Sequence, residues 1–315
     1  MIQGIRRVCS GKLRTPGRSL TDAAWSVLFV APALTLLGVF ALLPVLAAGW
    51  LGFHRRLPIF GIDEFVGLSN YIRLAGDERF RAACRTTLYF TGLSVTAEVL
   101  LGLALALLLA RGIQGGERGS AWGRVLILIP WAIPTVVSAR MWEWLYHGEY
   151  GLVNYLLLRT GLIAEPVNWL GDPVWAIHGA ILMDVWKTTP FAALLLLAGL
   201  QAIPRELSLA AQVDGAGPWT IFRRITLPLL LPVIVIVLIF RTMDAVRVFD
   251  AVYVLTGGGP GNSTETLSIY AYKTLFQTLQ FGYGSALATT MFLLGLLFTL
   301  GYVFLLRGYL RELSR

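Results

Sequence analysis

Six long apolar runs, separated by more polar connections, dominate the pattern of residues along this 315-residue chain. The runs extend over about Ala23–Leu51, Thr86–Ala110, Arg124–Tyr146, Val174–Leu200, Thr226–Val248 and Ser285–Leu306. A helix of roughly 20 apolar residues crosses the hydrocarbon core of a bilayer and satisfies its own backbone hydrogen bonds. The pattern therefore predicts an all-α fold, a polytopic membrane protein with six transmembrane helices.

The composition agrees with a membrane protein, because 56% of the residues are hydrophobic and only 14% are charged. A soluble domain has about a quarter of its residues charged. The first apolar run follows a basic segment, as a secretory signal does, but it is longer than the roughly 7–15 apolar residues of a signal peptide. We therefore expect an N-terminal tail over residues 1–22, a six-helix transmembrane domain over 23–307 and a C-terminal tail over 308–315.

Lysine and arginine are distributed unequally between the two sides of the predicted membrane domain. With the N-terminus in the cytoplasm, the inner segments carry 14 of these residues and the outer segments carry 8. Cytoplasmic loops of membrane proteins are enriched in Lys and Arg. This predicts a multi-pass protein of the cell (inner) membrane with both termini in the cytoplasm. The same rule accounts for the net charge of +8, so no nucleic-acid partner is inferred.

The connection between the fourth and fifth runs, which is cytoplasmic in this topology, has a specific local pattern. Its first part, IPRELSLAAQVDGAG, predicts a short helix on which the small residues Ala210 and Ala211 share one face. Gly215 and Gly217 permit a turn with positive φ, and Pro218 suits the first turn of a second short helix. From these residues alone, two interpretations remain open: a solvated surface loop, or a hairpin that a partner approaches closely.

The stretch AAQVDGAGPWTIFRRITLPLLLP resembles the cytoplasmic coupling loop of ABC importer permeases, in which Glu-Ala-Ala precedes Asp-Gly-Ala and an Ile-x-Leu-Pro ending. The matching residues are Ala210, Ala211, Asp214, Gly215, Ala216, Ile225, Leu227 and Pro228. In that family the loop docks into a cleft of the ATP-binding subunit. The resemblance implies a coupling segment over about residues 201–228, which also contains Glu206 and Phe222. Leu209 stands where the family has Glu, and Glu206 is the acid one turn earlier.

Other stretches resemble the sugar-importing branch of the same family. They include FVGLSNYIRL, DVWKTTPFAALLLLAGLQAIPREL and FDAVYVLTGGGPGNSTETLSIYAY. The resemblance implies a permease subunit that imports a mono- or disaccharide, or a related polyol or sugar phosphate, by alternating access. It implies as partners a second permease subunit in a heterodimer, two ATP-binding cassette subunits that hold ATP and Mg, and an extracytoplasmic substrate-binding protein. No cofactor is expected on this chain itself.

The glycine-rich stretch TGGGPGNST does not indicate a nucleotide site. A P-loop requires the pattern G-x-x-x-x-G-K-[ST], and this stretch has no lysine. We expect a turn-rich outer loop here and ATP hydrolysis in a separate subunit. The three histidines, His54, His147 and His178, lack metal-ligand spacing, so neither a metal ligand nor a catalytic residue is predicted.

Charged residues inside the apolar runs form four groups. These are Glu98; Arg140 and Glu143; Asp184 and Lys187; and Arg241, Asp244, Arg247 and Asp250. Charges within a span usually face the protein interior or a wet cavity, and a spacing of three lets opposite charges pair on one helical face. Arg140 and Glu143 are predicted to form a structural pair. The predicted substrate path consists of Asp184, Trp186, Lys187, Asp244, Arg247 and Asp250, in which the tryptophan ring could stack on a sugar.

Two other classes of function remain as alternatives. A self-contained secondary transporter needs its own ion-coupling site and often shows internal pseudo-symmetry, but the two halves of this chain show no clear repeat. A membrane enzyme needs a convergent acid–base or metal set, and none is apparent in the sequence. Whether uptake depends on ATP-hydrolysing subunits discriminates the importer from the secondary transporter.

Overall fold

The computed structural model describes residues 20–114 and 119–313, and the chain divides into two units, residues 1–50 and 51–315. The expected N-terminal tail lies outside the described residues except for residues 20–22. In the expected C-terminal tail, residues 314–315 lie outside them.

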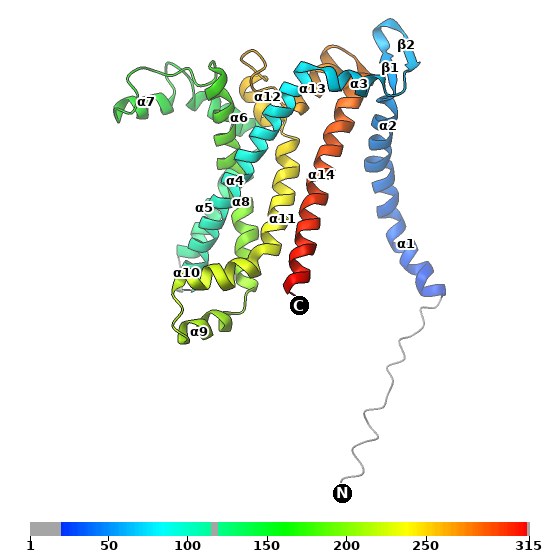
Figure 1. The fold of residues 1–315 in the computed structure, drawn as a ribbon. Helices are drawn as coiled ribbons and strands as arrows, with labels where there is room; N and C mark the ends of the chain where they lie inside the picture. The colour runs from blue at the N-terminus through cyan, green and yellow to red at the C-terminus, as the bar shows by residue number, and fades with distance from the viewer. Residues whose placement is uncertain (1–19, 115–118, 314–315) are drawn as a thin grey trace. The chain divides into compact units, whose positions relative to one another are not determined.

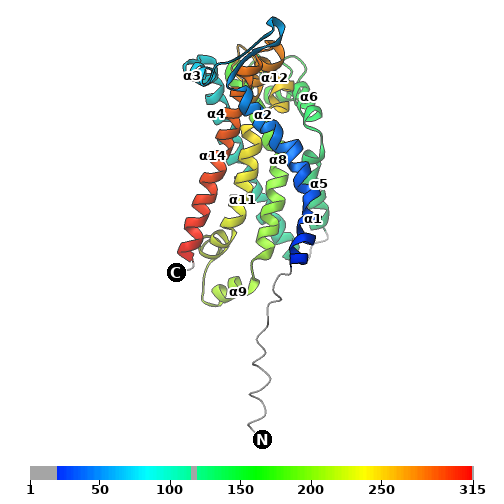
Figure 2. The same ribbon diagram turned by 90° about the vertical axis from the view of Figure 1, so that its right-hand side faces the viewer.

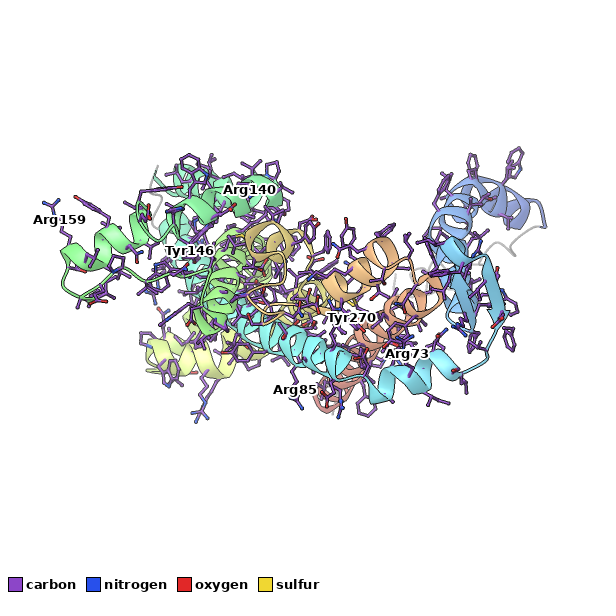
Figure 3. All side chains as sticks on the ribbon, turned by 90° about the horizontal axis from the view of Figure 1, so that it is seen from above. Arg73, Arg85, Arg140, Tyr146, Arg159 and Tyr270 are labelled. Atoms are coloured by element: carbon purple, nitrogen blue, oxygen red, sulfur yellow. The ribbon has the colours of Figure 1, made fainter. Side chains whose placement is uncertain are left out.

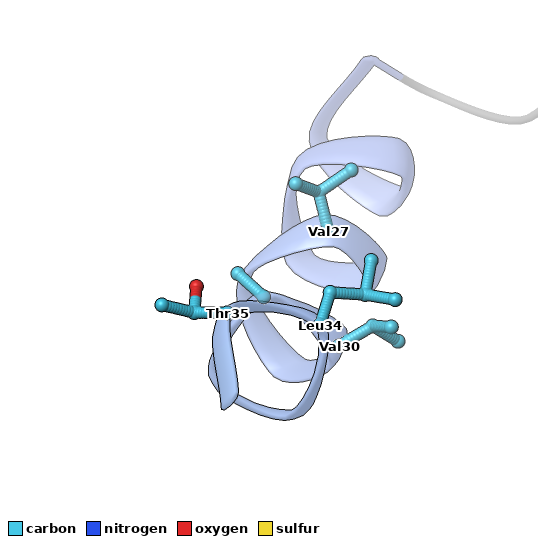
Figure 4. Close-up of a pocket in the computed structure, with 5 residues that line it drawn as sticks. Val27, Val30, Leu34 and Thr35 are labelled. Atoms are coloured by element: carbon cyan, nitrogen blue, oxygen red, sulfur yellow. The ribbon is translucent and has the colours of Figure 1, made fainter. Parts of the chain in front are cut away.

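One apolar helix in the first unit corresponds to the predicted first span. It consists of α1 (Leu20–Leu37), the π-helical segment η2 (Gly38–Leu42) and α2 (Leu43–Leu51). The stretch Val27–Leu51 is long and apolar enough to cross a membrane. A hollow of about 510 Å³ on this helix is lined by Val27, Val30, Ala31, Leu34 and Thr35 (Figure 4). Because four of these side chains are apolar, this surface suits lipid chains or another apolar helix.

Four long helices run side by side in the second unit (Figures 1 and 2). They are α4 (Glu78–Gln114), α8 (Pro173–Ala202), the continuous helix formed by α10 (Pro218–Ile221), η4 (Phe222–Thr226) and α11 (Leu227–Val246), and α14 (Phe281–Leu313). α8 is the central one, because 72% of its most apolar stretch is buried and it packs against both α4 and α11. With the helix of the first unit, these are the five unbroken helices in the described residues that could span a membrane.

The predicted third span is not one straight helix. It is divided into α5 (Gly119–Ala132) and α6 (Thr135–Leu145), which are bent by 94° at the break. The cause is local, because Pro134 has no N–H to donate and disfavours a helical conformation at the preceding residue, Ile133. If this bent pair counts as one span, the described residues contain up to six spans, as the sequence predicts.

Shorter elements gather at the end of the second unit opposite α9 (Arg205–Val213) (Figures 1 and 2). They are β1 (His54–Leu57), the 3₁₀ turn η3 (Pro58–Phe60), β2 (Ile62–Phe65), α3 (Ser69–Gly76), α7 (Leu152–Arg159), α12 (Asp250–Thr256), α13 (Leu267–Tyr272) and the π-helical η5 (Lys273–Gln277). The strands form an antiparallel hairpin in which His54 is opposite Phe65. The hairpin lies against α14, where a Cβ at Gly282 would collide with the His54 carbonyl.

Small residues allow close contact between α4 and α8. A Cβ added at Gly102 would lie 2.9 Å from the Cβ of Ala192 and 3.1 Å from the backbone nitrogen of Ala193. Helix interfaces in membranes are enriched in small residues because van der Waals packing holds the helices together there. The same two helices carry the buried acids Glu98 and Asp184, so their close packing also determines where these carboxylates lie.

Candidate functional site

The predicted coupling segment folds as a helix, a turn and a helix at the end of the second unit opposite α12 and α13 (Figure 1). α10 begins at Pro218, as the sequence predicts. The turn after α9 is a Schellman motif, in which the N–H of Ala216 donates to the Ala211 carbonyl at 2.8 Å and the N–H of Gly215 donates to the Gln212 carbonyl at 3.0 Å. These two bonds satisfy carbonyls at the helix end and fix the direction in which the chain leaves α9.

Gly215 occupies the left-handed position of this motif, with φ of +81°. Glycine is favoured there because a Cβ is strained at positive φ, and the predicted positive φ is confirmed. The same prediction is wrong for Gly217, which has φ of −72° and ψ of 164°. Gly217 is the N-cap of α10, and an N-cap residue takes an extended backbone rather than a left-handed one.

Little of the coupling segment is buried within this chain. α9 contains no buried residue, and Leu209, Val213 and Trp219 are 57%, 88% and 70% exposed. A cleft of about 920 Å³ separates α9 and α10 from the neighbouring ends of α4 and α8. Of the predicted coupling residues, Glu206, Ala210, Asp214 and Gly215 are exposed, and Ala211, Ala216, Phe222, Ile225, Leu227 and Pro228 are partly buried. Leu209 and Trp219 line this cleft. The segment therefore leaves large apolar side chains uncovered in this chain, as contact surfaces do.

A series of ion pairs extends from the core of the second unit to its surface. The Arg241 guanidinium on α11 donates to both carboxylate oxygens of Glu98 on α4, at 2.5 and 3.1 Å. It also donates to Asp244 at 3.1 Å, and Asp244 accepts from Arg247 at 3.3 Å. Side-chain exposure rises from 0% at Glu98 and 5% at Arg241 to 55% at Asp244 and 59% at Arg247. The spacing of three residues on α11 thus produces the pairs that it predicts.

Asp184 and Lys187 have partners other than each other, contrary to the pairing that their spacing suggests. The Oδ2 atom of Asp184 lies 3.6 Å from an Arg241 nitrogen and has no hydrogen-bond partner. The Lys187 ammonium donates to the carbonyls of Ile133 at 2.7 Å and Trp131 at 3.4 Å. Ile133 lies in the break between α5 and α6, and Trp131 lies in the last turn of α5. Carbonyls at a helix end lack partners within the helix. Lys187 therefore stabilises the broken span.

The other charged and aromatic candidates lie in separate surroundings. The rings of Trp186 and Trp142 meet edge-on, with centroids 5.7 Å apart, and Asp250 is the exposed first residue of α12. Arg140 and Glu143 form the predicted pair on α6, at 2.6 Å. Two of the six predicted path residues, Asp184 and Asp244, thus lie against the Arg241 guanidinium, and a third, Arg247, joins them through Asp244. The other three do not join that set of ion pairs in the described residues.

A second charge cluster, at the end of the unit with α12 and α13, is one that the sequence does not predict. The Glu265 side chain is 2% exposed, accepts from Arg79 at 2.7 and 2.8 Å and pairs with Lys273 at 2.9 Å. Burial alone would raise the pKa of Glu265, but the hydrogen bonds from Arg79 and Lys273 outweigh it, so the pKa lies below its ordinary value. Arg79 and Glu265 are 186 positions apart, so no local pattern links them.

Asp77 is the centre of a polar cluster beside Glu265. Its carboxylate accepts from the hydroxyls of Tyr270 and Tyr283 and from the backbone N–H of Arg79 at 2.8 Å. Burial opposes these hydrogen bonds, which nevertheless lower the pKa of Asp77, while burial and the bond to Asp77 raise the pKa of Tyr270 to about 12. The Arg73 guanidinium lies 4.4 Å from the Tyr283 ring centre, and Figure 3 labels Arg73 and Tyr270 in a view from above. The cluster ties α3 and α4 to α13 and α14.

Residues 99–311 match the family described as the binding-protein-dependent transport system inner membrane component. The chain belongs to this family. The permease is 46% identical over 282 residues to the trehalose/maltose transport system permease protein MalF of Thermococcus litoralis, covering 90% of this chain and 93% of that protein. It is 42% identical to the sulfoquinovosyl glycerol transport system permease protein SmoG of Agrobacterium fabrum, covering 91% of this chain and 92% of that protein.

The fold of the permease is also found in a crystal structure of a bacterial ABC transporter involved in the import of the acidic polysaccharide alginate. The two chains have a TM-score of 0.77 and 24% identity, over 92% of this chain and 99% of that chain. The prediction of an ABC importer permease fold is confirmed, and the protein is a multi-pass inner-membrane subunit of a binding-protein-dependent importer. ATP hydrolysis in such an importer lies in separate subunits. Among the described residues, no group of three or more His, Cys, Asp or Glu could hold a metal ion.

Proposed function

We propose that this permease imports a carbohydrate, which is a mono- or disaccharide or a related polyol or sugar phosphate. The observation that carries the proposal is the 46% identity, over 90% of the chain, to a permease named for trehalose and maltose. The relative named for sulfoquinovosyl glycerol also handles a glycosyl compound. Both names point to a substrate with several hydroxyl groups rather than to a peptide or an amino acid.

The complex that we propose contains a second permease subunit in a heterodimer, two ATP-binding cassette subunits and an extracytoplasmic substrate-binding protein. ATP and Mg are held by the cassette subunits, and this chain binds no cofactor. Closure of the cassettes on ATP moves the coupling segments, and the path then opens toward the loaded binding protein. Separation of the two cassettes then opens the path toward the cytoplasm.

The proposed coupling element is the segment over about residues 201–228, docked on a cassette subunit. Its support is physical: the segment exposes Leu209, Val213 and Trp219, and its turn is fixed by the Schellman motif at Gly215. The helix that starts at Pro218 continues without a break to the end of α11, over 29 residues. A movement of the docked end is therefore transmitted along one rigid helix toward Asp244.

The proposed sugar path runs along the exposed side of the α11 C-terminus, where Asp244 and the C-cap residue Arg247 lie. Exposed charges on a span are costly in lipid and usually face a polar cavity. A carboxylate accepts hydrogen bonds from sugar hydroxyls, and a guanidinium donates to them. Asp184 remains a proposed member of the path and lies beside Asp244 at the Arg241 guanidinium. Trp186, Lys187 and Asp250 also remain proposed members, with separate surroundings in this chain.

We also propose that the tails at residues 1–22 and 308–315 and the turn at Gly215 face the cytoplasm, while Gly258 faces outward. Single-cysteine labelling in a chain without Cys9 and Cys84 tests this topology. Val213 and Leu162 are suitable positions because they are 88% and 72% exposed. An impermeant thiol reagent added to intact cells should label the Leu162→Cys variant and not the Val213→Cys variant. Labelling of Val213→Cys from outside would contradict the topology.

Uptake in cells tests the proposed substrate class. The full complex is expressed with its binding protein, and the uptake of labelled trehalose and maltose is compared with that of a labelled amino acid and a labelled peptide. We expect saturable uptake of a sugar, and loss of that uptake when this chain is omitted. Uptake of the amino acid or peptide with no sugar uptake would refute the carbohydrate assignment.

A further inference from the structure

We propose that Glu98 and Arg241 are positioning residues that hold the Asp244 carboxylate in place on the sugar path. The proposal rests on the proposed role of Asp244 in sugar import. It assigns a task to two fully buried side chains that do not themselves reach the exposed face of α11.

The geometry supports this task because Glu98 binds one side of the Arg241 guanidinium and Asp244 accepts a hydrogen bond from the other side. Its Nε and one terminal nitrogen donate to the two Glu98 oxygens, at 2.5 and 3.1 Å. Such a two-point contact fixes the plane of a guanidinium. The remaining terminal nitrogen then points at Asp244 Oδ2, at 3.1 Å.

The Asp244 carboxylate is consequently bound from both sides. Arg241 donates to Oδ2, and Arg247 donates to Oδ1 at 3.3 Å. Arg247 is also fixed, because its Nε donates to the Met243 carbonyl at 3.0 Å. A half-exposed aspartate on a helix would otherwise change rotamers freely, and a fixed acceptor loses less entropy when a hydroxyl binds to it.

Stability alone does not explain a charged pair at this place. The Glu98–Arg241 pair places two desolvated ions in the contact between α4 and α11. Apolar side chains of similar volume usually stabilise such a contact as well as an ion pair does, or better. Apolar side chains could not hold a carboxylate 3 Å away, however. The Glu98–Arg241 pair is therefore better explained by its hydrogen bond to the Asp244 carboxylate than by helix packing.

A double-mutant cycle tests the proposal in the reconstituted complex, with the maximal uptake rate and KM for the sugar measured per assembled transporter. Glu98→Gln should lower the maximal rate about tenfold, as expected when one charge-assisted hydrogen bond loses its geometry. The same change in an Asp244→Asn background should lower the rate no further. Glu265→Gln is the matched control, because it breaks another buried carboxylate–guanidinium pair and should have the same effect in both backgrounds.

The outcomes separate this inference from the proposed function. If Asp244→Asn leaves uptake unchanged, the path assignment fails, and the positioning role fails with it. If Asp244→Asn lowers uptake but Glu98→Gln is harmless, or multiplies the loss in the double variant, only the positioning role is overturned. Should Glu98→Gln fail to assemble, the neutral set Glu98→Gln, Arg241→Met and Asp184→Asn leaves no buried charge without its partner. That set must then show the same tenfold loss with Asp244 present and no further loss with Asn at that position, and any other result overturns the proposal.

Discussion

Gly215 and Gly217 offer a matched test of the coupling segment, because they are two residues apart and differ in backbone conformation. Neither has any atom within 4 Å of an added Cβ, so steric collision within this chain is excluded at both. Gly215 has φ of +81°, whereas Gly217 has φ of −72° as the N-cap of α10. The same substitution by serine therefore probes backbone strain at the first position and not at the second.

The expected size of the effect follows from this difference. A non-glycine residue in the left-handed conformation costs roughly 1–2 kcal/mol. This cost lowers the population of the Schellman turn, relative to other conformations of the hairpin, by a factor of about 5–30. Serine is among the favoured residues at an N-cap, so Gly217→Ser should be neutral. Gly215→Asn should lie between the wild type and Gly215→Ser, because asparagine tolerates the left-handed region better than other residues.

The assay is the ATPase rate of the purified complex in lipid nanodiscs, with and without sugar-loaded binding protein, together with the subunit stoichiometry. We expect Gly215→Ser to keep the stoichiometry and to lose most of the stimulation by the loaded binding protein. Gly217→Ser should behave as the wild type. Equal behaviour of the two serine variants would refute the reasoning, because strain at Gly215 would then have no part in coupling.

Three further predictions follow from the packing and the charges. Gly102→Ala should lower the thermal midpoint of the complex, by an overpacking cost of about 1–3 kcal/mol at the α4–α8 contact, whereas Gly92→Ala, with no atom within 4 Å of its added Cβ, should not. The pKa of Glu265 is lowered in the folded protein, so its ionised carboxylate should stabilise the fold fully above the ordinary pKa of 4.5. This stabilisation should be lost as the pH falls through the lowered pKa of the folded protein, and Glu265→Gln should abolish this pH dependence of thermal unfolding. Asp244→Ala and Arg247→Ala should each reduce uptake per assembled complex, and the double variant should lose less than the two losses combined, since neither charge is then left without its partner; normal uptake in both single variants would refute this.

The apolar runs predict which segments form long helices better than they predict where those helices end. The expected fourth span, Val174–Leu200, differs by one or two residues at each end from α8, Pro173–Ala202. The expected second span begins at Thr86, whereas α4 begins at Glu78. A helix continues beyond the bilayer core wherever its polar residues are solvated or paired, and hydropathy does not record that continuation.

Proline likewise has different effects that depend on packing. Pro134 separates α5 from α6, but Pro190 lies inside α8 and Pro232 inside α11 without a break. The spacing of charges along the sequence likewise predicts some of the ion pairs and not others. The i,i+3 pairs on α11 follow from spacing, but the Glu98–Arg241 contact joins residues 143 positions apart, and only the packing of α4 against α11 brings them together.

The most direct test of the central claim is sugar accumulation in proteoliposomes that contain the complete complex, with ATP on the cassette side and loaded binding protein on the other side. Ionophores that abolish proton and sodium gradients are added to half of the samples. We predict that accumulation requires both ATP and the binding protein and is unchanged by the ionophores. Accumulation that proceeds without ATP and stops when the ion gradients collapse would contradict an ATP-driven importer and would identify a secondary transporter instead.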